Sequence, residues 1–492
     1  MAHFADEQAR RIDKLYNDPH HFIWIDAAWI AMLIRQKIID GRHVYPVAKS
    51  VLELWQSSDP NYHGFGGICR YVMDNYGTEV GGNLTLGRTI PPLAQIMPVR
   101  YELTKFICTL IDFQQTLLDM ASAHVDAVMP GYTHMQHAQP TTFGHYLLSI
   151  YDPIERISKT IEDSYQAFSL NELGCGALAG TSWPIDRKMV TEYLGFHDLI
   201  ENCNDAVSYT DGYLLLVAAL TNIMAVISRL AFDIRVWSTI EFGYLNLEWK
   251  APDHPQEKGG KGQSRSYFMP NKTTHTTNPE HTNINAAKVL GALTQVAAMA
   301  MCLPQQDCME MMHMIDGTQV ALRLTETELR RYQHALPRTQ VCRSKMLETI
   351  NRDYSCATEL ANYITRHHSV DYRIAHKIVN EFVLESKAKS ITADQADLEI
   401  LEQKAEKIIG RRLGMSAGAL KQCLDPVAFV NATNSQGGVA PAEVMRMVRE
   451  RTRRLEQRRA RHLDRIEKGE RAKEALLQDI IRFRETAQKE VE

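Results

Sequence analysis

Residues 259–280 hold the densest group of side chains that could do chemistry. Three glycines in "KGGKGQ" precede "SRSYFMPNKTTHTTNPE", which offers the hydroxyls of Ser264 and Ser266 and the fixed positive charge of Lys272. The glycines confer mobility, so this segment could close over a ligand. Hydroxyls, backbone amides and a lysine suit a small polyanion, and the alternative on composition alone is a disordered surface insertion. The GxxxxGK[ST] and GxSxG patterns are missing, which argues against a phosphate-binding P-loop and an acyl-transfer serine.

The segment "GYTHMQHAQP", residues 131–140, is the second candidate. It is predicted to be a short loop in which His134 lies between Thr133 and Gln136. A histidine beside hydroxyl and amide groups can act as an acid, a base or an anion binder. The alternative is a histidine hydrogen-bonded in a structural turn. His137 suggests a metal site, but no Cys, His or carboxylate ligands accompany it at metal-binding spacing, so we predict neither a metal nor a cofactor.

Long helices must position these segments. Apolar residues recur at three- and four-residue spacing in four stretches, at 101–128, 141–170, 211–238 and 284–302. No sustained two-residue alternation is present, which predicts an all-α fold. Turn-forming residues cluster at the ends of the helical runs, where free backbone amides can bind anions. These clusters occupy residues 81–92, 129–140, 174–184, 251–280 and 431–441.

Two helical stretches depart from the amphipathic pattern. Residues 211–238 are nearly apolar all round and resemble a membrane span, but they contain Asn222, Ser228 and Arg229, and no other segment is similar. We therefore predict a helix buried in a bundle and no membrane association. The chain after residue 445 is rich in charge and poor in aromatic residues, which predicts a solvated terminal helix that could pair with a partner helix.

Length and composition limit the remaining possibilities. A chain of 492 residues suggests about three domains or one elongated architecture. Its 45% hydrophobic and 23% charged residues are typical of a globular protein, and the net charge of −4 gives no electrostatic reason to expect nucleic acid as a partner. Nine cysteines without CxxC pairs predict reduced thiols and a cytoplasmic location. The N-terminus lacks the pattern of a secretory signal.

Several segments together resemble the aspartase/fumarase superfamily, and within it the argininosuccinate lyase branch. "GYTHMQHAQPTTFGH" and "SRSYFMPNK" resemble the superfamily's signature segments. Other stretches resemble the branch, in order over about residues 80–445: "GCGALAGTSWPIDRKMVTEYLGF", "ENCNDAVSYTDGYL", "YSCATELANYITRHHSVDYRIAHKIVNEFV" and "LDPVAFV…GGVAP". The resemblance implies an all-α, three-domain fold with a long central helical bundle. It also implies a homotetramer in which each active site draws on three chains.

The resemblance suggests a division of the chain into four parts. Residues 1–92 would form an N-terminal helical domain, and residues 93–345 a central bundle domain with a mobile catalytic loop. Residues 346–445 would form a C-terminal helical domain, and residues 446–492 a charged helical tail.

The resemblance also implies a chemistry. Enzymes of this superfamily cleave a C–N or C–O bond β to a carboxylate, usually releasing fumarate. A base removes the proton next to that carboxylate, and donors and cations hold the resulting aci-carboxylate. Aligning Met269 and Pro270 with the family pattern makes Ser266 the base and places Lys272 at the lysine position. Because a serine hydroxyl is a poor base, loop amides and the cation must stabilise its alkoxide.

The remaining site residues also follow from the resemblance. His134 and Thr133 match residues that contact a substrate carboxylate and assist protonation of the leaving group. The complete set of expected substrate-binding residues is Arg88, Thr89, Thr133, Gln136, Met269 and Asn278.

Departures from the family pattern indicate a changed substrate. In "LGRTIPPL", Gly87 and Arg88 match, but Pro91 replaces an asparagine that binds a carboxylate. Asn283 replaces a glutamate that orients the histidine, so His134 is expected to be a less effective base. The stretch "PQQDCME", residues 304–310, replaces the groups that recognise the arginine part of argininosuccinate.

We therefore predict a homotetrameric carbon–nitrogen lyase that has kept the serine base and acts on a small carboxylate. The predicted reaction is β-elimination from a succinyl-type or N-substituted aspartate substrate, releasing fumarate or an analogue. The alternatives are a related elimination from a nitro- or iminodicarboxylate compound in secondary metabolism, true argininosuccinate lyase activity, and a catalytically silent structural homologue.

Overall fold

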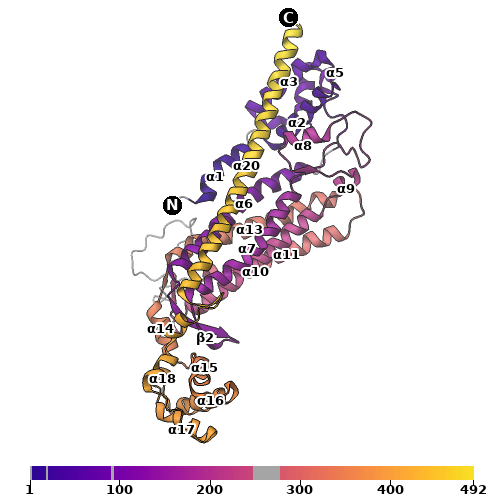
Figure 1. Cartoon of the computed structure of the whole chain (residues 1–492). Helices are drawn as coiled ribbons and strands as arrows, with labels where there is room; N and C mark the ends of the chain where they lie inside the picture. The colour runs from indigo at the N-terminus through magenta and orange to yellow at the C-terminus, as the bar shows by residue number, and fades with distance from the viewer. Residues whose placement is uncertain (1–2, 18–19, 90–92, 248–276, 492) are drawn as a thin grey trace, which may run out of the picture.

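The protein is elongated and almost entirely helical (Figure 1). The computed structural model describes residues 3–17, 20–89, 93–247 and 277–491. The predicted all-α fold is confirmed. The central bundle contains six long helices: α6 (Leu93–Ala123), α7 (Phe143–Ala167), α10 (Asp211–Trp237), α11 (Thr277–Met301), α13 (Met314–Ala335) and α20 (Pro441–Val491).

The four predicted helices correspond to α6, α7, α10 and α11, with shifted ends. The largest difference is in α6, which begins at Leu93 although the prediction began at residue 101. Pro98 lies inside its early turns and hid them from the sequence pattern. Within the bundle, α10 packs against α7, α11 and α13, and α6 packs against α7, α13 and α20.

Shorter helices cover the two ends of the bundle (Figure 1). The N-terminal region contains α1 (Phe4–Asn17), α2 (His21–Arg35), α3 (Gly41–Ser57), the 3₁₀ helix η1 (Pro60–Tyr62), α4 (Gly67–Tyr76) and α5 (Thr78–Gly81). Between bundle helices lie α8 (Arg187–Tyr193), α9 (Cys203–Val207), α12 (Met309–Met312) and η2 (Leu336–Arg338). The C-terminal region contains α14 (Arg343–Asn351), α15 (Ala357–His368), α16 (Tyr372–Ala388), η3 (Ala393–Gln395), α17 (Leu398–Ile409), α18 (Ala417–Leu424) and α19 (Pro426–Ala432).

The strands of the described residues form three small pairs. β1 (Val128–Thr133) and β2 (Gln136–Thr142) make an antiparallel hairpin. β3 (Leu170–Asn171) and β4 (Asp198–Leu199) are parallel. β5 (Leu245–Leu247) pairs with β6 (Thr339–Val341) in antiparallel fashion.

Two hydrophobic cores lie along the molecule. The larger core joins the N-terminal helices, the bundle and one face of α20. The smaller core is built almost entirely from residues between Ile350 and Val439. The domain boundaries proposed at residues 92, 345 and 445 stay predictions.

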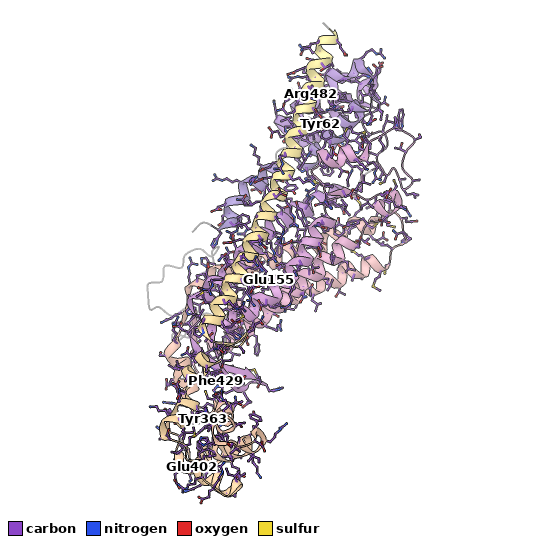
Figure 2. The ribbon with its side chains drawn as sticks, in the orientation of Figure 1. Tyr62, Glu155, Tyr363, Glu402, Phe429 and Arg482 are labelled. Atoms are coloured by element: carbon purple, nitrogen blue, oxygen red, sulfur yellow. The ribbon has the colours of Figure 1, made fainter. Side chains whose placement is uncertain are left out.

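The expectation of a solvated helix after residue 445 is wrong for one face of α20. This 51-residue helix runs beside the bundle and buries Leu455, Ile466, Leu476 and Ile480 along one stripe. Three salt bridges connect arginines of α20 to acids of α7. The pairs are Arg451–Asp152 at 2.6 Å, Arg454–Glu155 at 2.8 Å and Arg458–Glu162 at 2.9 Å, and Glu155 is labelled in Figure 2. The high charge of the segment had concealed this apolar stripe.

Two described helices are long and apolar enough to cross a membrane by length and composition, namely α10 and residues Pro279–Met301 of α11. The prediction recognised only the first of these. In α10, 56% of the most apolar window is buried, as in a core helix of a bundle. In α11 only 17% is buried: Val289 and Val296 face the core, whereas Ile284, Leu290 and Met301 are exposed.

Candidate active site

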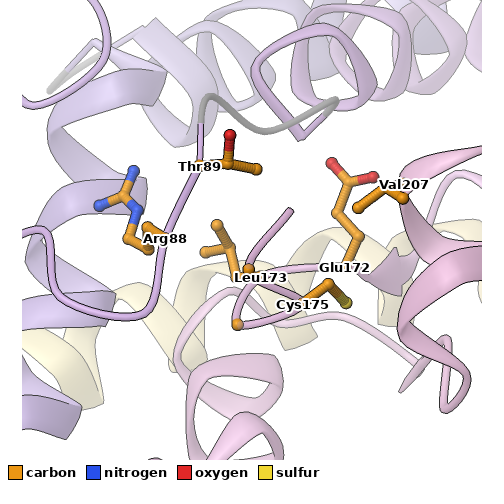
Figure 3. A pocket seen from close by; sticks show the side chains of 8 residues that line it. Arg88, Thr89, Glu172, Leu173, Cys175 and Val207 are labelled. Carbon is orange, nitrogen blue, oxygen red and sulfur yellow. The ribbon is translucent and has the colours of Figure 1, made fainter. Parts of the chain in front are cut away.

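Arg88 and Thr89 follow α5 and line a narrow pocket (Figure 3). The opposite side of the pocket comes from the segment after β3 and from the end of α9. The complete lining is Arg88, Thr89, Glu172, Leu173, Gly174, Cys175, Gly176 and Val207. The predicted turn cluster at 174–184 therefore meets the predicted cluster at 81–92 in space, although 81 residues separate them in the sequence.

The Arg88 guanidinium has an internal partner. Its Nη1 donates to Asp26 Oδ1 of α2 at 2.8 Å, and the two side chains are 1% and 3% exposed. The rings of Trp29 and Phe65 lie 5.8 and 4.8 Å from the guanidinium carbon. Its Nε and Nη2 are buried and have no hydrogen-bond partner among the described residues. Arg88 is therefore held firmly and keeps donors for a further acceptor.

Glu172 lies across the pocket from Thr89, and the Arg88 guanidinium is directed away from the Glu172 carboxyl group (Figure 3). Its side chain is buried, and neither carboxyl oxygen has a hydrogen-bond partner in the described part of the chain. Burial raises the pKa of Glu172 well above its usual range, and the nearby charge of Asp307 raises it further. Sequence reasoning missed this residue, although an acid at the edge of a glycine-rich turn cluster was an available signal.

Other polar groups surround this end of the bundle. The hydroxyls of Tyr209 and Tyr213 are buried without a hydrogen-bond partner among the described residues. Burial raises the pKa of both tyrosines, and Glu172 raises it further when its carboxyl group is ionised. Gln305 Nε2 donates to Ser208 Oγ at 2.6 Å, so the stretch 304–310 also lies at this end. We name the pocket and these neighbours the pocket end of the bundle.

The segment around His134 is a β-hairpin, whereas the sequence predicted a short loop. His134 and Met135 form its two-residue turn with φ values of 54° and 59°, the left-handed conformation of a type I′ turn. The prediction failed because the usual Asn-Gly signal of such turns is missing here. Thr133, His134, Met135 and Gln136 are all exposed.

His137 lies on the side of the same hairpin. Its Nδ1 is 3.3 Å from Asp353 Oδ2, and its ring meets Tyr132 edge-on. The Tyr132 hydroxyl lies 3.1 Å from the Tyr244 hydroxyl, which ties the hairpin to the segment before β5. Within the described ranges, no group of three or more His, Cys, Asp or Glu side chains is arranged to hold a metal ion. We name this region the hairpin end of the bundle.

Helix α7 separates the two ends within one chain. It begins directly after β2 and ends just before β3 and Glu172. A helix of 25 residues is about 37 Å long at a rise of about 1.5 Å per residue. The hairpin that carries His134 and the segment after α5 that carries Arg88 therefore lie at opposite ends of the bundle, as the labels β2 and α5 show (Figure 1).

The sequence and the fold both match known proteins. Residues 92–291 match the family model described as "Lyase", and residues 354–431 match the one described as "Argininosuccinate lyase C-terminal". The chain is 30% identical over 451 residues to argininosuccinate lyase 1 of Shouchella clausii, covering 88% of this chain and 87% of that protein. The chain belongs to the argininosuccinate lyase family. It is a carbon–nitrogen lyase of the aspartase/fumarase superfamily, as the sequence predicted.

Further relatives of this lyase agree with that assignment. The argininosuccinate lyase of Methanocaldococcus jannaschii is 28% identical over 473 residues, with 92% of each chain covered. The structure of EDDS lyase in complex with formate has the same fold, with a TM-score of 0.81 at 23% identity over 97% of this chain and 96% of that one. A class II fumarase from Schistosoma mansoni matches with a TM-score of 0.64 at 14% identity, over 85% and 90% of the two chains.

The site residues expected for this lyase fall into four groups. Arg88 and Thr89 are at the pocket end, whereas Thr133, His134 and Gln136 are at the hairpin end. Asn278 lies in the first turn of α11. The remaining expected residues, Ser266, Met269 and Lys272, lie outside the described residues, as does Pro91. All of these assignments stay predictions.

Proposed function

We propose that this lyase catalyses β-elimination of an amine from an N-substituted aspartate and releases fumarate. The observation that carries this proposal is the match to argininosuccinate lyases along 88% of the chain. The pocket end supports it, because a buried guanidinium with free donors suits a substrate carboxylate. The true substrate is expected to have a different leaving group from argininosuccinate, since Pro91 and the stretch 304–310 depart from the family pattern.

In the proposed mechanism, Ser266 removes the proton next to the substrate carboxylate. Lys272 and the amides of its loop stabilise the alkoxide of the base and the aci-carboxylate that follows. Arg88 and Thr89 hold one carboxylate. Thr133 and His134 contact the substrate and assist protonation of the departing amine, while Gln136, Met269 and Asn278 complete the binding site. The C–N bond breaks as the carbon–carbon double bond of fumarate forms.

We propose further that the active unit is a homotetramer with composite active sites. The separation of the pocket and hairpin ends by the length of α7 supports this, because their residues would meet only between chains. The outward face of the bundle also supports it. This face carries large exposed apolar side chains on α10 and α11: Leu215, Phe232, Ile284, Leu290 and Met301. Sedimentation analysis that found a stable monomer at micromolar concentration would contradict the tetramer and the shared sites.

A substrate panel tests the proposed reaction. Purified protein is offered N-substituted aspartates with different amine groups, and fumarate release is followed by ultraviolet absorbance. We expect fumarate release from at least one compound. If no compound released fumarate, the proposed reaction would be contradicted and a catalytically silent structural homologue would be favoured. Nitro- and iminodicarboxylate compounds in the same panel test the related elimination. We expect the protein to work in the cytoplasm, on a small carboxylate.

Argininosuccinate is the second candidate substrate, because the curated relatives carry its name. We expect it to be cleaved poorly, since a site that loses hydrogen-bond partners for a polar substrate discriminates strongly. A kcat/KM for argininosuccinate of about 10⁴ M⁻¹s⁻¹ or more would be that of an efficient enzyme and would contradict this expectation.

A further inference from the structure

Glu172 is a buried acid that accepts no hydrogen bond from a described residue, although the positive charge of Arg187 partly offsets the rise of its pKa. Its side chain is 3% exposed, and both carboxyl oxygens are buried without a hydrogen-bond partner among the described residues. An unpaired buried carboxyl group is costly to keep, and such groups are commonly found where a ligand completes their interactions. Glu172 also lines the same pocket as Arg88 and Thr89 (Figure 3).

Arg88 lines the same pocket as Glu172, and the charge of Arg187 acts on Glu172, but both arginines have other hydrogen-bond partners. Arg88 donates to Asp26 at 2.8 Å. Arg187 uses Nε, Nη1 and Nη2 on three backbone carbonyl oxygens, at 2.9, 3.1 and 2.7 Å. These acceptors belong to Leu173, Glu201 and Ile200. Neither guanidinium is bonded to Glu172, so a role as a structural ion-pair partner does not explain the acid.

The charges around the pocket favour a ligand with a carboxylate at one end and a positively charged group at the other. The free donors of Arg88 suit a carboxylate, as proposed above. On the other side, Glu172 is reinforced by Asp307, whose negative charge is close enough to raise the pKa of Glu172. An acid supported by a second acid attracts a cation and repels an anion.

We propose that Glu172 is a specificity-determining residue that pairs with a second, positively charged amine on the leaving group. This inference rests on the proposed function and names its substrate class. The favoured substrates are N-substituted aspartates whose departing amine carries a further ammonium group, and the favoured leaving groups are diamines. Pairing would consist of N–H donation from the ammonium to the Glu172 carboxylate, with no covalent step.

Binding of an ammonium group to Glu172 can be detected, because Glu172 should release a proton when the ammonium binds. Burial raises the pKa of Glu172 well above its usual range, which favours the protonated form while no cation is bound. A bound ammonium favours the ionised carboxylate, so Glu172 loses its proton to the buffer as the ligand binds. A carboxyl group with only a structural role would not release a proton on binding of an amine.

Calorimetry on the full-length protein tests the inference without requiring turnover. The probes are 1,3-diaminopropane and its near-isostere butylamine, each titrated in the presence of saturating succinate, in two buffers of different ionisation enthalpy. The wild-type protein is expected to bind the diamine at least about tenfold more tightly, which is the scale of one charge-assisted hydrogen bond. Its binding heat for the diamine should depend on the buffer.

Glu172→Gln is the critical variant, because the amide has the shape of the protonated acid but cannot ionise. It is expected to lose both the diamine preference and the buffer dependence. Glu201→Gln is the matched control, since Glu201 is an exposed acid of the neighbouring segment that does not line the pocket, and it should retain both. Unchanged diamine binding in Glu172→Gln, or equal weakening for both amines, would overturn the inference.

Further measurements distinguish misfolding of the variant, failure of the inference about Glu172 and failure of the proposed reaction. If Glu172→Gln does not fold, Glu172→Asp keeps the charge, and it should retain part of the diamine preference; equal weakening for both amines would again overturn the inference. If the wild-type protein releases fumarate but prefers neutral leaving groups, the inference fails and the proposed function stands. If diamine binding follows the expected pattern but no aspartate derivative is cleaved, the proposed reaction fails and the cation site stands.

Discussion

The two ends of the bundle are built in opposite ways. At the pocket end, charged groups are buried, and the Arg88–Asp26 pair has side chains only 1% and 3% exposed. At the hairpin end, the expected site residues Thr133, His134 and Gln136 lie exposed on a two-residue turn. Burial fixes side chains in place, whereas an exposed turn leaves its side chains available to another surface. The difference is what the proposed composite site requires, with a preformed half-site at one end of a chain and a projecting element for a partner chain at the other.

The largest effect is expected from the proposed base, Ser266. Ser266→Ala should leave folding and assembly intact and lower kcat by about two to three orders of magnitude, the scale of a positioned acid or base. Ser264→Ala is the control and should be much milder. Equal, small losses in both variants would show that the alignment of this segment is wrong.

Removing the charge of Asp26 at the pocket end is expected to lower the stability of the protein. Asp26→Asn leaves the Arg88 guanidinium buried and unpaired, so the free energy of unfolding should fall by about 3 kcal/mol. Urea denaturation at one fixed protein concentration measures this. Asp40→Asn is the matched control, because Asp40 pairs with Arg42 at 2.7 Å on the surface, and it should change stability little. A similar loss of unfolding free energy in both variants would show that the buried pair contributes no more to stability than the exposed pair.

Mixing variants tests whether the two ends meet between chains. His134→Ala should lower activity about a hundredfold with little loss of stability, because the side chain is exposed. Arg88→Lys keeps the charge but loses the planar fork, and should also lower activity. Co-expression of the two variants should give activity above either parent, since some sites then combine an intact hairpin with an intact pocket. Mixed assemblies without any gain would place the whole site within one chain.

The smallest effect is expected from His462 of α20, which is fully buried away from both ends. Burial lowers the pKa of His462 to about 3, and its Nε2 lies 3.0 Å from the carbonyl oxygen of Thr104. Above pH 6.5 the imidazole is neutral in both the folded and unfolded states. Between pH 6.5 and about 3, only the unfolded chain binds the proton, so stability falls as the pH falls.

The slope of this contribution should approach about 1.4 kcal/mol per pH unit below pH 6. Denaturation of the wild-type protein and of His462→Gln at pH 7 and pH 5.5 checks the expectation. The variant should lose less stability on acidification than the wild type. Identical slopes for the two proteins would show that His462 does not carry the pH dependence.

Much of the fold could be read from periodic patterns, and the errors have identifiable causes. The apolar spacing of residues 211–238 predicted α10 to within one residue at its end. The hairpin was missed because His134 and Met135 adopt left-handed backbone angles without the glycine or asparagine that usually marks them. The burial of α20 was missed because its apolar stripe is sparse among many charges.

The sequence by itself determined the family, the helical architecture and the expected chemistry of the lyase. Local spacing sets helices, and ordered motifs such as "GYTHMQHAQPTTFGH" identify relatives whatever the packing. Only the tertiary structure decided that Arg88 is paired with Asp26, that Glu172 faces the same pocket, and that His134 lies at the far end of α7. Burial and ion pairing depend on which segments, far apart in the sequence, come into contact, and a local sequence pattern does not specify those contacts.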